Sequence, residues 1–198
     1  MSYELIAKGD QCTMRSCGEC QLCCKLFPVP ALDKPAGQWC RHSCAGGCAI
    51  HGPRQPEICR QYDCYWRDHD ELSNAWRPDR IGVVVTESGN VMVEGRYIPV
   101  VTMQEDFKDA GRGIEAARMI DRFVQRGFAV MVIHGLVSRL EFDRARYLGV
   151  SDEMIEAALR YELSQGADDL RELGAVKESF RKLSFDEALA ACRKEREA

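Results

Sequence analysis

The chain has 198 residues, 45% of them hydrophobic, which suffices for one domain or for a small module joined to a larger one. Its formal net charge of −4 argues against a protein built to neutralise many nucleic-acid phosphates. No run of about 18 apolar residues predicts a membrane span, and the N-terminal segment MSYELIAKGDQC lacks the apolar stretch of a signal peptide. We therefore expect a cytoplasmic protein without a nucleic-acid or membrane partner.

Cysteines are concentrated in the first third of the chain. Ten of the eleven lie between Cys12 and Cys64, and only Cys192 lies beyond. A disulfide framework and a thiolate metal site are the two explanations for such a segment. A reducing cytosol, the odd number of cysteines and the adjacency of Cys23 and Cys24 all favour metal. Residues 1–66 show no persistent periodicity, so metal binding is also the expected source of their order.

The strongest motif is CGECQLCC at residues 17–24, with the spacing C-x2-C-x2-C-C. Cysteines two residues apart can turn both sulfurs toward one ion, and Gly18 suits the turn between them. A third cysteine at this interval resembles the iron–sulfur wrapping of bacterial ferredoxins, which a remote fourth cysteine completes. Successive side chains of extended backbone point to opposite faces. Cys23 and Cys24 are therefore expected in different sites, unless one of them does not touch metal.

Further cysteines follow at spacings looser than those of a zinc ribbon: Cys40, Cys44, Cys48, Cys59 and Cys64. With these, enough thiols are present for two four-thiolate sites. The spacing leaves open which cysteines share a site.

These residues carry a resemblance to a known family. CGECQLCC at 17–24, Trp39-Cys40, GCAIHGPRQPEIC at 47–59 and RQYDCYW at 60–66 resemble the CxxCxxCC cysteine-cluster family, also called YkgJ-like. The resemblance implies a bacterial zinc- or iron-chelating protein. It also implies eight metal-binding cysteines, which are Cys17, Cys20, Cys23, Cys24, Cys40, Cys48, Cys59 and Cys64. Similar segments look like iron–sulfur ligands in a flagellin lysine methylase. Cys12, Cys44 and Cys192 lie outside the pattern.

The remaining polar and aromatic residues of interest have simpler expected roles. His42 and His51 are possible ligands, but eight thiols favour surface or supporting roles for them. His69 is expected at a solvated surface, and His134 in a structural role after a strand. Aromatic residues are expected to cover the site: Trp39, Tyr62, Tyr65 and Trp66. Basic residues next to cysteines are expected to offset thiolate charge: Arg15, Lys25, Arg41 and Arg60.

The second part of the chain has regular patterns. β-Branched runs predict strands at 81–86, 91–94 and 96–101, with a turn at 87–90. Thr102 and Glu105 have capping-box spacing before a predicted helix whose apolar stripe runs from 114 to 124 and ends at Gly127. A buried strand is predicted at 128–133, and further helices open at Ser151 and at the box Ser184 to Glu187.

The predicted fold class is α+β, in which an irregular cysteine-rich lobe packs on a small β-meander with C-terminal helices. The expected parts are a metal-binding lobe at 1–78 and a sheet with helices at 79–198, forming one compact unit.

Three functions are compatible with these patterns. The preferred one is a redox or accessory protein that carries an iron–sulfur cluster for a partner enzyme. The first alternative is a structural zinc module that presents the C-terminal half to a protein partner. The second is a metal-dependent enzyme, although the sequence contains no motif that specifies a reaction.

Overall fold

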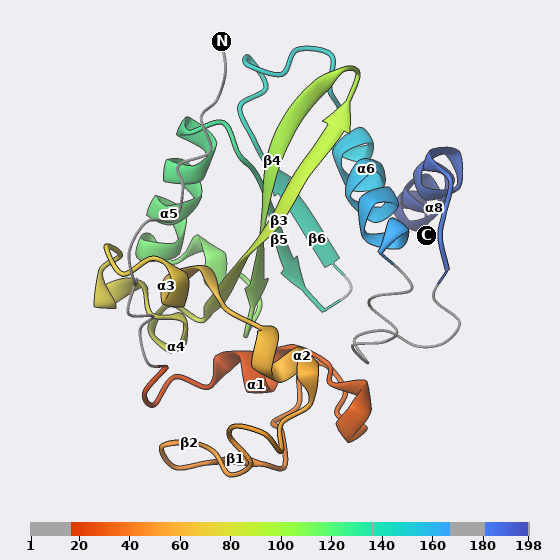
Figure 1. Ribbon diagram of the computed structural model, residues 1–198. Helices are drawn as coiled ribbons and strands as arrows, with labels where there is room; N and C mark the ends of the chain where they lie inside the picture. The colour runs from red at the N-terminus through yellow and green to blue at the C-terminus, as the bar shows by residue number, and fades with distance from the viewer. Residues whose placement is uncertain (1–16, 136, 167–180, 198) are drawn as a thin grey trace, which may run out of the picture.

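The computed structural model describes residues 17–135, 137–166 and 181–197. Its centre is a four-stranded sheet with the strand order β3-β4-β5-β6 (Figure 1). The strands are β3 (Val83–Val93), β4 (Arg96–Glu105), β5 (Ala129–His134) and β6 (Val137–Glu141). β4 and β5 run parallel, and the other two neighbouring pairs are antiparallel. The predicted mixed α+β class is confirmed.

The first two strands are longer than the sequence pattern suggests. The turn predicted at 87–90 lies within β3, where the pairing with β4 shifts register between Glu87 and Asn90. The actual hairpin turn follows β3 at Glu94 and Gly95, which have φ values of 47° and 73°. A bulge keeps one strand continuous while it absorbs extra residues, so turn-forming residues there do not end the strand.

The helix start predicted at Thr102 and Glu105 is wrong, because β4 continues through both residues. Val101 and Met103 are each 0% exposed, and their burial depends on the strand conformation. The Glu105 carboxylate does not cap a helix. It accepts a hydrogen bond from the backbone N–H of Gly111 at 2.8 Å and pairs with Arg139.

Helix α5 (Ile114–Gln125) connects the parallel strands β4 and β5 and covers one face of the sheet (Figure 1). Ala116, Met119, Ile120 and Phe123 form its buried stripe, whereas Ile114 is 73% exposed. The chain leaves the helix through Gly127, whose φ of +90° suits a residue without a Cβ. The predicted helix and the strand after it are therefore confirmed, with small shifts in their boundaries.

Two C-terminal helices begin at the predicted caps. The Ser151 hydroxyl accepts from the Met154 N–H at 3.3 Å at the start of α6 (Asp152–Gln165). At the start of α8 (Phe185–Glu197), Ser184 N–H donates to the Glu187 carboxylate at 2.8 Å and Glu187 N–H donates to the Ser184 hydroxyl at 3.2 Å. This reciprocal pair is a capping box. α6 covers the sheet face opposite α5 and separates α8 from the sheet (Figure 1).

The N-terminal lobe lies at one end of the sheet and consists of short elements joined by loops (Figure 1). Its helices and strands are α1 (Leu22–Leu26), α2 (Glu57–Gln61), α3 (Tyr65–Asp68), α4 (Pro78–Ile81), β1 (Ser43–Cys44) and β2 (Gly47–Cys48). Its 3-10 turns are η1 (Pro30–Leu32) and η2 (Asn74–Trp76), and η3 (Ala110–Arg112) lies before α5.

Valine side chains of β3 divide the packing between the two faces of the sheet. Val83 and Val85 face α5, whereas Val84 points to the other face and contacts Leu22 and Leu26 of α1. The cysteine lobe is thus attached to the sheet through a small apolar cluster beside the area that α6 covers. None of the helices within the described ranges is both long and apolar enough to cross a membrane.

Candidate metal centre

Four cysteines surround a small hollow where the lobe meets the sheet. The hollow is lined by Cys17, Cys20, Cys23, Cys64, Trp66, Pro78 and Val84. Its volume is about 20 Å³. A cavity needs about 10–15 Å³ to admit one water-sized sphere. The space therefore matches a single small atom or ion, and we call these four cysteines the first set.

Local backbone geometry brings the first set together. Gly18 has a φ of +55°, and the Cys20 N–H donates to the Cys17 carbonyl at 2.9 Å, which closes the turn expected for a C-x2-C pair. Helix α1 then supplies Cys23. Cys64 comes from a distant part of the chain, where it precedes α3 and its carbonyl accepts from the Arg67 N–H at 2.9 Å.

Burial has the largest effect on the pKa of three thiols of the first set. It raises the pKa of Cys17 and Cys20, and it raises the pKa of Cys64 to about 11. The nearby Arg67 guanidinium opposes this effect at Cys17. Desolvated thiols hold their protons more tightly than thiols in water, unless a positive charge is present to stabilise the thiolate.

The adjacent thiols of Cys23 and Cys24 contact each other, and only Cys23 lines the hollow. Both lie in α1, and successive residues of a helix are rotated by about 100° from one another. A hydrogen bond between the two side chains raises the pKa of Cys23 and lowers that of Cys24 to about 7. The sequence argument assumed extended backbone and needs correction, because both residues are helical and their thiols lie within hydrogen-bond distance of each other, although only Cys23 lines the hollow.

The second set consists of Cys24, Cys40, Cys48 and Cys59. The Cys40 N–H donates to the Cys24 carbonyl at 3.1 Å, and the β1–β2 ribbon pairs Ser43 with Cys48. Burial raises the pKa of Cys59, and the charges of Cys24, Cys40 and Cys48 act on it in the same direction. The eight cysteines expected to bind metal thus lie as two neighbouring groups of four free thiols, and the assignment of each group to one metal site stays a prediction.

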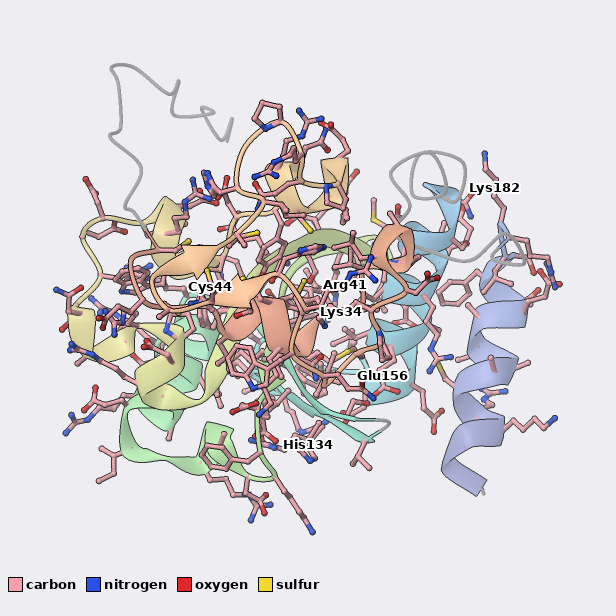
Figure 2. All side chains as sticks on the ribbon, turned by 90° about the horizontal axis from the view of Figure 1, so that it is seen from below. Lys34, Arg41, Cys44, His134, Glu156 and Lys182 are labelled. Atoms are coloured by element: carbon pink, nitrogen blue, oxygen red, sulfur yellow. The ribbon has the colours of Figure 1, made fainter. Side chains whose placement is uncertain are left out.

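Lys34 lies beside the second set and is only 7% exposed. Its Nζ donates to three carbonyl oxygens, those of Lys25 at 2.9 Å, Phe27 at 2.5 Å and Pro35 at 3.0 Å. Its positive charge lowers the pKa of Cys24, although the hydrogen bond from Cys23 has the larger effect. Figure 2 shows Lys34 and Arg41 within the lobe, viewed from below.

The basic residues next to cysteines mostly have other partners. Lys25 pairs with Asp106 at 2.5 Å, Arg60 pairs with Glu57, and the exposed Arg41 donates to His42 at 3.4 Å. Arg15 lies outside the described residues. Sequence adjacency therefore missed Lys34 and Arg67, whose charges act on Cys24 and Cys17.

Cys44 and Cys192 lie outside the two sets. Cys44 is exposed, and its thiol donates to the Gly47 carbonyl at 3.4 Å. Cys192 is buried between α6 and α8. Cys12 falls outside the described residues.

Two histidines have unexpected surroundings. His69 is half-buried, stacks on Tyr65 with ring centroids 3.7 Å apart, and lies with its Nδ1 2.9 Å from the Tyr65 carbonyl oxygen. The Nδ1 of His134 is buried without a hydrogen-bond partner among the described residues. His51 is exposed, as expected.

The aromatic residues cover the lobe unevenly. Trp66 is 7% exposed and lines the hollow, and the half-buried Tyr62 packs with the α1 cluster, where its hydroxyl lies 2.9 Å from that of Thr86. Tyr65 belongs to the core beneath α5. Trp39 is 56% exposed, and the Lys25 ammonium lies over its ring, 5.9 Å from the centroid.

The ten cysteines within the described ranges are all free thiols. As placed in these ranges, no three His, Cys, Asp or Glu side chains form a group arranged to hold a metal ion. The two sets are candidate ligand groups whose thiols would have to move to bind an ion. Comparisons with protein-family models, with curated proteins and with solved structures find no match to this chain. The resemblance to the cysteine-cluster family stays a prediction, and the functional argument depends on geometry.

Proposed function

We propose that the N-terminal lobe is a thiolate metal-binding module and that the protein is a redox or accessory protein for a partner enzyme. One observation carries this proposal: Cys17, Cys20, Cys23 and Cys64 line an ion-sized hollow beside the apolar surface of Trp66, Pro78 and Val84. Such surroundings exclude water and strengthen charge interactions.

The chemistry of the donor set fits a soft metal. Four cysteines suit tetrahedral zinc or an iron–sulfur cluster, because both are bound by thiolates. Burial makes the unliganded thiols hold their protons, so metal binding would release protons and draw the sulfurs together. Lys34 brings a positive charge near Cys24, which favours the thiolate form, whereas the charge of Arg67 near Cys17 is opposed by its ion-pair partner Asp63.

The sequence spacing of the first set favours iron–sulfur chemistry, whereas its hollow of about 20 Å³ matches a single ion, so the lobe would have to widen to hold a cluster. Three cysteines from one C-x2-C-x2-C run and a fourth from a distant segment are the ligand pattern of cubane clusters. A cluster of this kind supplies one-electron transfer. The contact between Cys23 and Cys24 places the two sets next to each other.

A structural zinc module is the second candidate, supported by the composition of the lobe. Its elements span only two to five residues each, and its contact with Val84 depends on Leu22 and Leu26. Segments of this kind gain much of their folding free energy from a bound metal.

Elemental and sulfide analysis with an absorption spectrum tests the proposal on protein purified without oxygen or added metal. Iron with sulfide and a brown chromophore supports the redox protein. Stoichiometric zinc without colour supports the structural module. If the folded protein retains neither iron nor zinc, even after anaerobic reconstitution with each metal, metal binding is refuted.

Single substitutions then test the two sets. Cys64→Ser is expected to lose the metal of the first set, and Cys59→Ser that of the second, so each retains about half of the total if both sets are loaded. Cys44→Ser is the matched control, because this exposed thiol lies in the same lobe outside both sets. An equal loss in the control would show that the ligands are wrongly assigned.

A further inference from the structure

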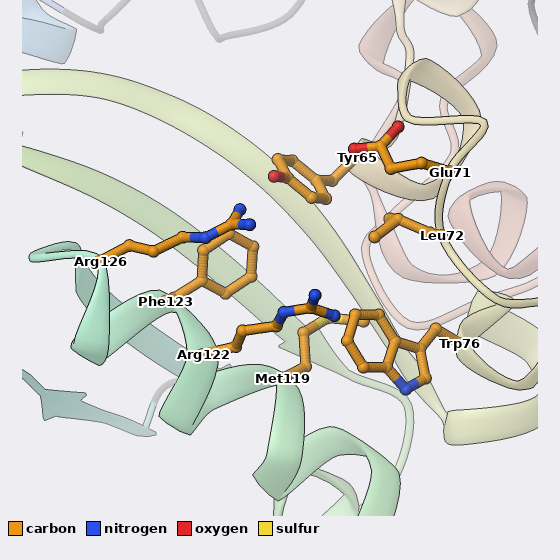
Figure 3. Close-up of a pocket in the computed structure, with 8 residues that line it drawn as sticks. All are labelled: Tyr65, Glu71, Leu72, Trp76, Met119, Arg122, Phe123 and Arg126. Carbon is orange, nitrogen blue, oxygen red and sulfur yellow. The ribbon is translucent and has the colours of Figure 1, made fainter.

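A second hollow lies between the lobe and α5, away from the cysteine sets. Its volume is about 60 Å³. It is lined by Tyr65, Glu71, Leu72, Trp76, Met119, Arg122, Phe123 and Arg126 (Figure 3). The lobe contributes the first four of these residues and the end of α5 the others, so the hollow spans the junction of the two parts.

Two guanidinium groups of the hollow have no carboxylate partner among the residues that the structure describes. Arg122 and Arg126 make neither a hydrogen bond nor an ion pair through their side chains in the described part of the chain. They stand four residues apart on one helix face, a spacing at which like charges destabilise a helix. The C-terminal end of a helix favours cations, but this preference does not require both side chains to turn toward the same hollow (Figure 3).

The aromatic walls hold the donors in place. The Arg122 guanidinium lies 5.4 Å from the centroid of the Trp76 ring, and the Trp76 Nε1–H donates to the Glu115 carboxylate at 2.9 Å. A guanidinium stacked on an aromatic face keeps its in-plane N–H groups free for another acceptor. Trp76 therefore orients Arg122 before any ligand arrives.

Tyr65 supplies a third donor. Its ring is fixed between His69, which stacks at 3.7 Å, and Phe123, whose centroid lies 5.1 Å away. Its hydroxyl points to the Arg126 side of the hollow (Figure 3). Burial raises the pKa of Tyr65, so the hydroxyl keeps its proton and can donate it in a hydrogen bond.

We propose that this hollow binds the carboxylate or phosphate group of a small molecule through Arg122, Arg126 and the Tyr65 hydroxyl. Guanidinium groups match the planar and bidentate geometry of these oxyanions. The space admits the anionic group, while the rest of the ligand extends past Glu71 at the exposed rim. A ligand so placed contacts both the lobe and α5 and stabilises their junction. The proposal does not depend on metal binding by the cysteines.

Calorimetric titration of the full chain with inorganic phosphate, acetate and phenyl phosphate tests the site. We expect saturable one-to-one binding of at least one of these probes. Preference for phosphate over acetate assigns a phosphate-bearing ligand, and the reverse preference assigns a carboxylate. Tighter binding of phenyl phosphate than of inorganic phosphate shows that the aromatic wall contributes. Absence of saturable binding for all three overturns the proposal.

Variants separate the proposed site from general surface charge. Arg122→Gln and Arg126→Gln should each weaken binding of the best probe about tenfold, because each removes a charge-assisted hydrogen bond. Tyr65→Phe keeps the ring and should weaken binding a few-fold, whereas Glu71→Gln removes a repelling charge and should tighten it. Arg112→Gln is the control, since Arg112 pairs with Asp109 outside the hollow. Equal weakening by Arg112→Gln would overturn the assignment.

Discussion

Val84→Ala should loosen the cysteine lobe selectively. The Val84 side chain is 1% exposed and contacts Leu22 and Leu26, so it attaches α1 to the sheet. Val91 lies on the same strand and is 0% exposed, but it packs in the cluster beneath α6, which contains no residue of the lobe. Val91→Ala is therefore a matched control for Val84→Ala, because it removes the same buried groups without contact with the lobe.

The expected size of the effect follows from the groups removed. Valine to alanine deletes two buried methyl groups, each contributing about 0.8 kcal/mol, and the cavity that remains brings the loss to about 2 kcal/mol. Both variants should lose a similar amount of global stability in urea unfolding. In Val84→Ala the free energy of local opening of the lobe should also fall. A decrease of about 2 kcal/mol corresponds to roughly 30-fold faster amide hydrogen exchange.

Hydrogen exchange of the Cys24 and Phe27 amides measures that opening, because these amides donate to the carbonyls of Gln21 and Cys23 at 2.9 and 3.2 Å. Their exchange should accelerate in Val84→Ala and stay near the wild-type rate in Val91→Ala under native conditions. Equal acceleration in both variants would mean that the lobe opens only with the whole molecule, and the attachment through Val84 would be refuted.

Three further predictions concern charge and metal. Glu105→Gln should cost about 2–3 kcal/mol in urea unfolding, because it leaves the Arg139 charge without its carboxylate partner, whose side chain is 1% exposed. Lys34→Met should accelerate metal transfer to a chromophoric chelator more than Arg41→Met does, since only the lysine is buried beside the second set. Chelation under reducing conditions should expose residues 17–66 to protease while the sheet stays protected; continued protection of that segment would contradict metal-dependent order.

The strands that could be predicted from the sequence are those in which several consecutive residues are apolar and buried. β5 is an apolar run, and its first four residues are all buried. β6 was not predicted, because Leu140 is its only buried residue within the described chain and its conformation depends on pairing with β5. An edge strand gains order from backbone hydrogen bonds to its neighbour, which leave no hydrophobic pattern of their own.

The failed helix start at Thr102 has a related cause. A capping box contributes about 1 kcal/mol, whereas burying Val101 and Met103 contributes more than that for each side chain. The capping box therefore does not form where the same residues can bury apolar side chains as part of a strand. At Ser151 and Ser184 no strand competes for the segment, and both caps form as the sequence indicates.

The sequence also predicts only part of the candidate metal site. Cysteine identity and C-x2-C spacing are local properties, so the turn at Gly18 and the delivery of several thiols by one segment could be foreseen. The pairing of Cys64 with the first set depends on where α3 packs against the sheet, which is a property of the whole fold.

The basic residues that lie near the cysteines are also determined by the whole fold. Arg41 is adjacent to a cysteine yet points to solvent, whereas Lys34 lies several residues from any cysteine and reaches the second set because three carbonyls hold its ammonium group inside the lobe. Electrostatic effects depend on distance and burial, so neighbours in sequence are poor guides to which charges a thiolate experiences.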